Sequence, residues 1–507
     1  MSFFRNTIIV TVLNIIGLCL SFMVSIIIFG KYGASYYMDS YAAAIAIPNY
    51  ISVVLGGALS YVFIPIFIKQ KIESNQWSLV NNIISIFIIL LGTVTLFGIW
   101  FAPGLMRIIA PGFGENQLTY SAELLCLYFP IIIFSCLNEL IASIFYSKNI
   151  FLIPLVNKLI SPLIIILSIF LLPSGLSVKN LIYASLASAF FQLFLLFFTL
   201  IRIENYNFKF KINFKDYEVS LLLKLLAPLI LSSLVYKLFP IIDSIYLSKL
   251  PVGNFSRISY ANKLQLVIGA LLNSVFSIQV FSLLSKHAAE NEFLEIKLKI
   301  SFFIRTMLFI AIPVAIIILI FGENIIRVLF QRGNFKYNDT LIVSNYLKIY
   351  ILALPAISIG SIVSNGLYVI PDTKSIMIVG FFESAFYIFI CSFIFNHLKA
   401  ISIPIAYTLN FNISVLILIL VLRKRLNNGG GIGILKSCFK TTLLFITIIS
   451  TILLIVKITK PSDFMIIFYC VFSILANLII AKLLNFQEVT FIYEKILQLS
   501  TKNKKLH

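Results

Sequence analysis

The chain has 507 residues, of which 60% are hydrophobic and only 11% are charged, and its mean hydropathy is +1.04. This composition excludes an ordinary soluble protein and predicts an integral membrane protein. A net charge of +20 would suggest nucleic acid as the partner of a soluble protein, but the basic residues here lie mostly between apolar segments. We therefore expect membrane lipids and an anionic lipid substrate as partners, and no nucleic acid.

Apolar segments long enough to cross a bilayer follow one another along the whole chain. There are fourteen, at about 7–30, 41–68, 79–102, 120–146, 149–173, 178–201, 220–247, 257–284, 300–322, 340–369, 375–396, 400–422, 438–456 and 464–484. The first is too long for the apolar part of a cleaved signal peptide, so we expect it to be retained. The sequence predicts an all-α integral membrane protein with about 14 transmembrane helices.

Basic residues indicate the orientation of these spans. An even number of spans places both termini on one side, and the connections on that side carry the larger share of lysine and arginine, including Lys69, Lys209, Lys297 and Arg423. The positive-inside bias then predicts a multi-pass protein of the bacterial cytoplasmic (inner) membrane with both termini in the cytoplasm.

The sequence argues against catalytic and metal chemistry. No connection exceeds about twenty residues, which leaves no room for a soluble catalytic domain. The six cysteines lie within apolar runs without a CxxC pair, so disulfide and metal sites have little support. The glycine-rich run at 427–433 follows no strand, and we interpret it as a cytoplasmic linker rather than a nucleotide loop.

An internal repeat indicates how the spans are organised. "FAPGLMRII" at 101–109 and "FGENIIRVL" at 321–329 place Phe and Arg identically at an offset of 220, and a pair of tyrosines recurs at 222, as Tyr128 and Tyr146, then Tyr350 and Tyr368. An offset of six helices predicts two parallel-topology six-helix bundles, 1–205 and 206–425, with the substrate site between them near the membrane midplane. Residues 426–507 would add a C-terminal helical hairpin and a cytoplasmic tail.

Ionisable residues inside the spans mark candidate functional positions, because each is costly in hydrocarbon unless it faces a cavity or a partner. They are Asp39, Glu123, Glu139, Lys158, Lys224, Lys237, Asp243, Lys263, Lys348 and Glu383. Lys237, Asp243 and the Asn262-Lys263 pair lie on adjacent spans that open the second half, where an amide and a cation could hold a phosphate or a sugar. A structural salt bridge between helices is the alternative.

The second span carries a stripe of small and polar residues. Asn49, Ser52, Gly56 and Ser60 follow the spacing i, i+3, i+7, i+11, which places them on one face of a helix. Such a face suits the wall of a cavity, although small residues also allow close packing of membrane helices.

At these residues the sequence resembles the MviN/MurJ family of lipid-linked oligosaccharide flippases, within the multidrug/oligosaccharidyl-lipid/polysaccharide exporter superfamily. The resemblance runs from the first span through at least the eleventh. The motifs that carry it are Asp39-Ser40-Tyr41, Ile47-Pro48-Asn49, Gly56-Gly57-Ala58, Phe63-Ile64-Pro65, "APGF" at 110–113, "GNFSRISYANKL" at 253–264, "LLSKHAAEN" at 283–291, "LFQRGNF" at 329–335 and "PDTKS" at 371–375.

The resemblance implies a flippase for an undecaprenyl-diphosphate-linked saccharide, with lipid II, the peptidoglycan precursor, as the first expectation. The family usually carries arginines in the first span and just after "IPN", where they are thought to receive the diphosphate. The first span here has no arginine, and Ser52 and Val53 stand in the place just after "IPN". Gly56 stands where the family tends to have glutamate, and Asn262-Lys263 replaces its Asp-Arg. These departures favour a flippase for O-antigen, capsule or other surface-polysaccharide units as the rival; a cation-coupled drug antiporter is the weaker one.

Roles for individual residues follow from the resemblance and the pattern together. We expect Lys263, Lys237, Asn262, Asn49 and Ser52 to bind substrate, and Asp39, Asp243, Gly56 and Gly57 to serve coupling or gating. The chain is expected to act as a monomer and to need no cofactor, with a coupling ion, Na⁺ or H⁺, left open.

Overall fold

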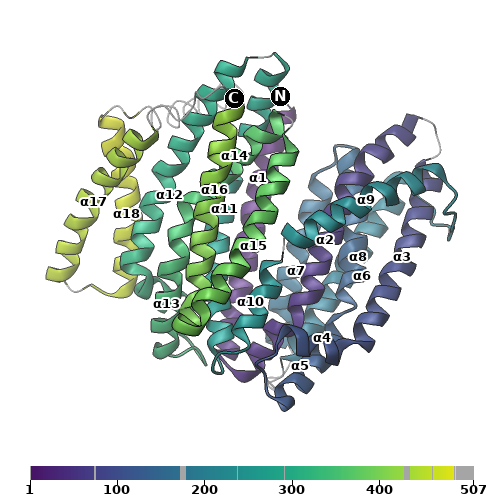
Figure 1. The fold of residues 1–507 in the computed structure, drawn as a ribbon, viewed down its shortest axis with the longest axis horizontal. Helices are drawn as coiled ribbons and strands as arrows, with labels where there is room; N and C mark the ends of the chain where they lie inside the picture. The colour runs from purple at the N-terminus through teal and green to yellow at the C-terminus, as the bar shows by residue number, and fades with distance from the viewer. Residues whose placement is uncertain are drawn as a thin grey trace. The chain divides into compact units, whose positions relative to one another are not determined.

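The computed structural model describes residues 2–72, 76–171, 178–236, 238–290, 292–370, 372–426, 434–459, 461–484 and 486. Within these ranges every regular element is a helix (Figure 1). The helices are α1 (Ser2–Tyr32), α2 (Tyr36–Ile72), α3 (Gln76–Trp100), α4 (Ala102–Ile109), α5 (Glu115–Tyr128), α6 (Ile131–Ser147), α7 (Leu152–Leu171), α8 (Lys179–Glu204), α9 (Tyr217–Tyr236), α10 (Phe239–Leu247), α11 (Asn254–Ala289), α12 (Phe293–Phe330), α13 (Tyr337–Tyr350), η1 (Ile351–Ala353), α14 (Leu354–Val369), α15 (Thr373–Leu398), η2 (Lys399–Ile401), α16 (Ser402–Arg425), α17 (Ile434–Thr459) and α18 (Asp463–Leu483).

Twelve stretches of the described chain are long and apolar enough to cross a membrane. They account for the expected fourteen spans with two differences: the spans at 375–396 and 400–422 merge into one stretch, Lys374–Arg425, and the span at 257–284 lies in α11, outside the twelve. The merged stretch still contains two separate helices, α15 and α16, divided by the short η2 turn. The predicted all-α membrane fold is confirmed.

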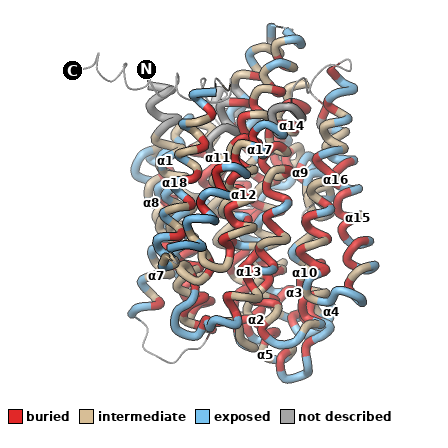
Figure 2. The backbone as a smooth tube through the Cα atoms, turned by 90° about the vertical axis from the view of Figure 1, so that its left-hand side faces the viewer, coloured by how far each residue is buried: buried red, intermediate tan, exposed pale blue. Residues whose placement is uncertain are grey.

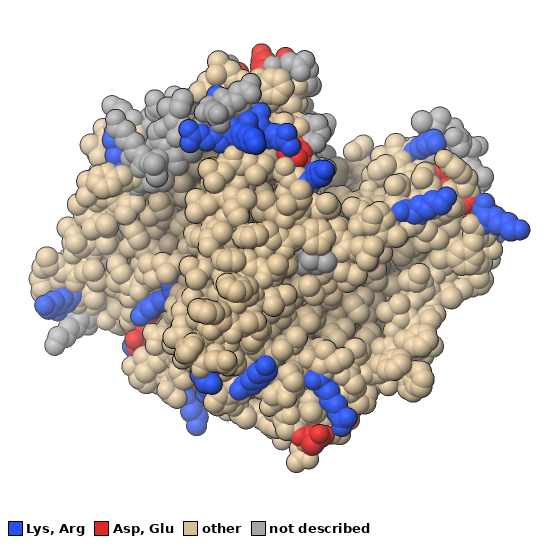
Figure 3. All heavy atoms as spheres, in the orientation of Figure 1, with Lys and Arg blue, Asp and Glu red and all other residues tan. Residues whose placement is uncertain are grey.

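Large apolar side chains cover much of the outer surface of the helices. Exposed and buried residues alternate along each helix (Figure 2), and the exposed ones include Trp100, Phe170 and Phe393, each more than 70% exposed. On the face drawn in Figure 3, charged side chains lie toward the helix ends and the middle of the helices is uncharged. A surface of this kind is stable only against lipid.

The helix bounds support the internal repeat. Helices α5 and α13 have the same length and are offset by 222 at both ends, so Tyr128 and Tyr350 each end a helix. Helix α6 begins at Ile131 and α14 at Leu354, an offset of 223. The recurring tyrosines therefore mark equivalent points of two copies of one helical pattern.

The chain divides into two compact units that do not follow a single cut in the sequence. Unit 1 comprises Met1–Ser259, Arg332–Phe335 and Ser384–Ile403. Within it, α2 packs against α5, α6 and α9, while α7 packs against α1 and α8. The expected boundaries at 205/206 and 425/426 stay a prediction.

Unit 2 comprises Tyr260–Gln331, Lys336–Glu383 and Pro404–His507, and it is built around the long helix α12. One apolar core joins α12 to α14 through residues such as Met307 and Ile362, and a second joins α12 to the hairpin of α17 and α18 through Phe321, Phe445 and Ile466. Burial of these side chains attaches the hairpin to unit 2.

Residues 372–375 of the "PDTKS" motif form the start of α15 in unit 2. Asp372 accepts hydrogen bonds from the Ser375 backbone N–H (3.1 Å) and hydroxyl (2.8 Å), which is the geometry of an N-cap. Arg425, at the end of α16, donates to the same carboxylate at 2.6 Å. The hydrogen bond from the Ser375 hydroxyl, together with Arg425, lowers the pKa of Asp372.

Candidate functional site

The polar stripe on α2 meets polar side chains of α5 and α6 in unit 1. Asn49 is exposed, and its Oδ1 accepts a hydrogen bond of 3.0 Å from the hydroxyl of buried Tyr128. Ser143 donates a 2.8 Å hydrogen bond to Ser60. The Ser52 hydroxyl is buried and has no hydrogen-bond partner among the described residues. A buried hydroxyl without a partner is costly, so this position has unused capacity to bind a polar group.

Gly56 of the stripe allows a charged residue of α6 to lie close to α2. Gly56 is buried, and a Cβ there would lie 3.4 Å from Cγ of Glu139 on α6. Gly57 beside it is partly exposed. The absence of a side chain at Gly56 therefore leaves room for Glu139 beside α2.

Glu139 forms an ion pair with Lys158 on α7, with 3.3 Å between carboxylate oxygen and Nζ. The two side chains are 36% and 50% exposed, and Tyr146 lies beside Lys158. Both residues lie inside the α6–α7 hairpin, where charged side chains of membrane helices pair with one another or face a water-filled cavity. The pair is therefore a candidate polar position inside unit 1.

Sequence reasoning placed Glu139 and Lys158 among the intramembrane charges but assigned them no role. A signal was present: Ser147 ends α6 and Leu152 begins α7, so residues at similar distances from this turn lie side by side in an antiparallel hairpin. Glu139 and Lys158 are nearly equidistant from the turn, which would have predicted the pair.

Asp39 is held by the beginning of α11. It is only 2% exposed; its Oδ2 accepts from the Gly253 backbone N–H at 2.6 Å, and its Oδ1 from the Ser256 backbone N–H (2.8 Å) and hydroxyl (2.7 Å). Gly253 has a φ of +85°, a conformation that favours glycine. The carboxylate thus satisfies free N–H groups at a helix start and ties the first turn of α2 to α11.

A second connection lies at the end of α1. The Asn334 backbone N–H donates to the Gly30 carbonyl at 2.8 Å, and its side-chain amide donates to the Lys31 carbonyl at 2.7 Å. Gly33 and Gly333 both have positive φ, and a Cβ on Gly333 would lie 2.4 Å from the Gly30 oxygen. The "LFQRGNF" motif therefore packs against the end of α1 because glycine allows the two backbones to touch.

Asp243 lies on α10, where it accepts a hydrogen bond from the hydroxyl of fully buried Tyr387 on α15. The rings of Phe239 and Tyr387 pack edge to face with centroids 4.8 Å apart. Helix α9 ends at Tyr236, and α10 begins at Phe239. Lys237 itself lies outside the described residues.

The remaining two candidates belong to unit 2. Lys263 is exposed on α11, and no described carboxylate lies within ion-pair distance of it. The neighbouring Asn262 has a buried Oδ1 without a hydrogen-bond partner among the described residues. These are groups that an anionic, hydroxyl-rich ligand could satisfy.

Comparison with known proteins identifies the family. A family model described as "Lipid II flippase MurJ" matches residues 28–475. The chain belongs to the lipid II flippase MurJ family. It is therefore a multi-pass membrane transporter and not an enzyme.

Named relatives cover most of the chain. A probable lipid II flippase MurJ of Buchnera aphidicola subsp. Schizaphis graminum is 30% identical over 377 residues, 73% of each chain. Its counterpart from Buchnera aphidicola subsp. Baizongia pistaciae is 29% identical over 423 residues, 81% of this chain and 82% of the relative.

Solved structures agree with this fold. A lipid II flippase MurJ in an inward closed conformation aligns with a TM-score of 0.79 at 22% identity, covering 97% of this chain and 100% of that one. An inward-facing multidrug resistance MATE family transporter of the MOP superfamily aligns with a TM-score of 0.67 at 14% identity, covering 81% of this chain and 94% of that one. The chain thus has the fold shared by MurJ and MATE transporters.

Proposed function

We propose that this chain moves lipid II from the cytoplasmic to the outer leaflet of the bacterial inner membrane by alternating access. The observation that carries the proposal is the MurJ family model, which matches nearly the whole helical part of the chain. The distribution of lysine and arginine supports an orientation with both termini in the cytoplasm. Nothing in this proposal requires an oligomer, and we expect a monomer to suffice.

Lys263 is the proposed binding group for the substrate diphosphate in unit 2. It is an exposed cation on a membrane helix without a described carboxylate partner, which leaves its charge available to an anion. Asn262 would hold a neighbouring oxygen or hydroxyl, and Lys237 is proposed on sequence grounds alone. Asn49 and Ser52 of α2 would contact the headgroup from unit 1.

Lys158 is the cation that we propose in place of the missing family arginines of unit 1. It lies with Glu139 beside the polar stripe, and half of its side chain is exposed. Glu139 keeps the lysine charged while the site is empty. When the substrate arrives, its two phosphate groups would replace the Glu139 carboxylate as the partner of Lys158.

The aspartates are the proposed coupling and gating groups. All three hydrogen bonds to Asp39 come from the start of α11, which favours a gate contact that must break when the outer ends of α2 and α11 separate. Asp243 accepts a hydrogen bond from the Tyr387 hydroxyl and has no hydrogen bond to the start of α11 among the described residues, which makes it the better candidate for coupling to Na⁺ or H⁺. Gly56 and Gly57 would let α2 move past Glu139 without a side chain in the way.

Native mass spectrometry of the gently purified chain tests the proposed substrate. We expect a co-purified mass that fragments as lipid II, and we expect Lys263→Ala to lose it while Lys224→Ala, a change at another lysine of a membrane helix, retains it. A different polyprenyl-diphosphate glycan would overturn lipid II in favour of surface-polysaccharide export. Retention of lipid II by Lys263→Ala would overturn the assignment of that residue.

A further inference from the structure

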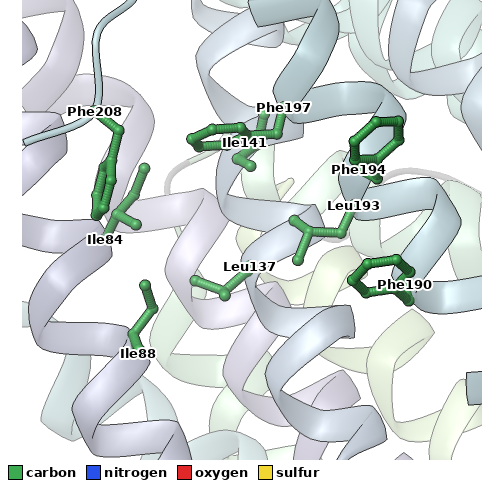
Figure 4. A pocket seen from close by; sticks show the side chains of 9 residues that line it. All are labelled: Ile84, Ile88, Leu137, Ile141, Phe190, Leu193, Phe194, Phe197 and Phe208. Carbon is green, nitrogen blue, oxygen red and sulfur yellow. The ribbon is translucent and has the colours of Figure 1, made fainter.

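An apolar groove runs along the outside of unit 1, above α6 and between α3 and α8. It has a volume of about 240 Å³ and no polar lining (Figure 4). Ile84 and Ile88 of α3 form one wall, Phe194 of α8 the other, and Leu137 and Ile141 of α6 the floor. Ile88 and Phe194 are partly open to the outside, so the groove faces the surrounding lipid.

Phe208 lines one end of the groove and belongs to the extended segment 206–213, which connects α8 to α9. Three side chains on one face of α3 fix this segment: Asn81, Ser85 and Asn82 accept hydrogen bonds from the backbone N–H groups of 209, 211 and 213 at 3.2, 3.1 and 2.8 Å. Because its backbone is bonded to α3, the segment forms a fixed rim rather than a free loop.

The rim alternates apolar and basic residues. Its apolar residues are Phe208, Phe210 and Ile212, and its basic residues are Lys209 and Lys211. Phe214 and Lys215 continue the pattern in the turn that follows. Successive side chains of an extended chain point to opposite sides. Phe210 and Phe214 are 62% and 60% exposed, which is stable at a membrane interface and not in water. The rim therefore marks the level of the lipid headgroups, and the groove lies just below it in hydrocarbon.

An aromatic ladder on α8 leads from the groove to a cation. Phe194 stacks on Phe198 with centroids 6.3 Å apart, and the Arg202 guanidinium lies 5.3 Å from the Phe198 ring. Arg202 and Lys209 are both exposed, and neither has a carboxylate partner among the described residues. Two exposed cations therefore lie near the groove: Arg202 follows the aromatic ladder of α8, and Lys209 is the neighbour of Phe208 in the chain.

We propose that this groove binds one acyl chain of an anionic glycerophospholipid, with its headgroup phosphate held by Arg202 and Lys209. The charge at the rim selects an anionic lipid over a zwitterionic one, since basic groups near the membrane surface attract anionic headgroups. The bound lipid would fix the rim, and with it the connection between α8 and α9, at the membrane surface. This site is separate from the α2 stripe that we assign to substrate.

Lipid-resolved native mass spectrometry tests the site, with the delipidated chain titrated by phosphatidylglycerol or phosphatidylcholine of identical acyl composition. We expect one phosphatidylglycerol to bind preferentially. Arg202→Gln with Lys209→Gln should weaken it by about 30-fold, since each basic group near an anionic surface contributes roughly fivefold. The matched control is Lys249→Gln. Like Arg202, Lys249 lies over an aromatic ring, with its Nζ 5.3 Å from the centroid of Tyr246, but it lies outside the groove.

A photoreactive acyl chain on the phosphatidylglycerol locates the hydrocarbon part. Cross-links should fall on peptides of α3 and α8, and Ile88→Trp, which fills the mouth of the groove, should reduce them. Equal binding of the two lipids, unchanged binding by the double glutamine variant, or cross-links elsewhere would overturn the proposal. Displacement of phosphatidylglycerol by a polyprenyl diphosphate at the same peptides would assign the groove to the substrate instead.

Discussion

Replacement of Asp39 by Asn should release the start of α11 from α2. Asn keeps one acceptor oxygen and places an amide N–H₂ where the second oxygen was, so at least one of the N–H donors of Gly253 and Ser256 loses its partner. A hydrogen bond to a charged group contributes about 1.5–3 kcal/mol, and loss of the negative charge at the helix start adds roughly 0.5 kcal/mol. The total is about 2–3.5 kcal/mol, or roughly 30- to 400-fold in the equilibrium between the tethered and released states.

Hydrogen exchange measured by mass spectrometry reads this equilibrium directly. Amide protection in the peptide that contains Gly253 and Ser256 should fall by about 30- to 400-fold in Asp39→Asn, because exchange follows the population of the opened state. Asp216→Asn is the control, since Asp216 accepts from the Glu218 N–H at the start of α9 and its loss should affect that helix start alone. Unchanged protection at Gly253 and Ser256 would refute the tether.

Three further changes test other parts of the account. Lys158→Gln should lower lipid II transport by at least tenfold at equal protein level, and additional Glu139→Gln should not restore it if the cation binds substrate; restoration would show a structural ion pair. Asp372→Asn should destabilise unit 2 by up to about 1 kcal/mol in thermal unfolding, because Asn remains a good N-cap but loses the charge that pairs with Arg425. Because the folded pKa of Asp372 is lowered, its contribution is present above pH ~4 and is lost as pH falls through the folded pKa, so the wild type and the variant should converge at low pH. Gly98→Ala would place a Cβ 2.0 Å from the Phe129 ring and should lower stability by about 1–3 kcal/mol or more, seen as loss of folded protein on size exclusion.

The fold could be predicted from sequence because hydrocarbon imposes length and composition on every span. Thirteen of the expected spans fall within the apolar stretches of the described chain, and the repeat reappears in the bounds of α5 and α13. The expected spans 375–396 and 400–422 correspond to the separate helices α15 and α16, which the short η2 turn divides. The division into two units follows from tertiary contacts, which hydropathy does not encode.

The site was predictable where local periodicity carries it. The α2 stripe follows from helical spacing, and Tyr128 and Ser143 meet it. The partner of Asp39 could not be predicted, because Gly253 lies 214 residues away along the chain and a hydrogen bond to its backbone leaves no side-chain signature. The same holds for the rim of the lipid groove, where the residues that Asn81 and Asn82 bind contribute backbone groups.

The most direct test of the central claim is the appearance of lipid II at the outer face of cells in which this chain is the sole lipid II flippase. An externally added enzyme that cleaves lipid II and cannot cross the membrane reports the flipped fraction. The fraction cleaved in cells that lack any flippase gives the background level. We predict cleavage at the level of a cell with its own flippase, abolished by Lys263→Ala and retained by Lys224→Ala. Lipid II that stays protected while the chain is folded in the membrane would contradict the account.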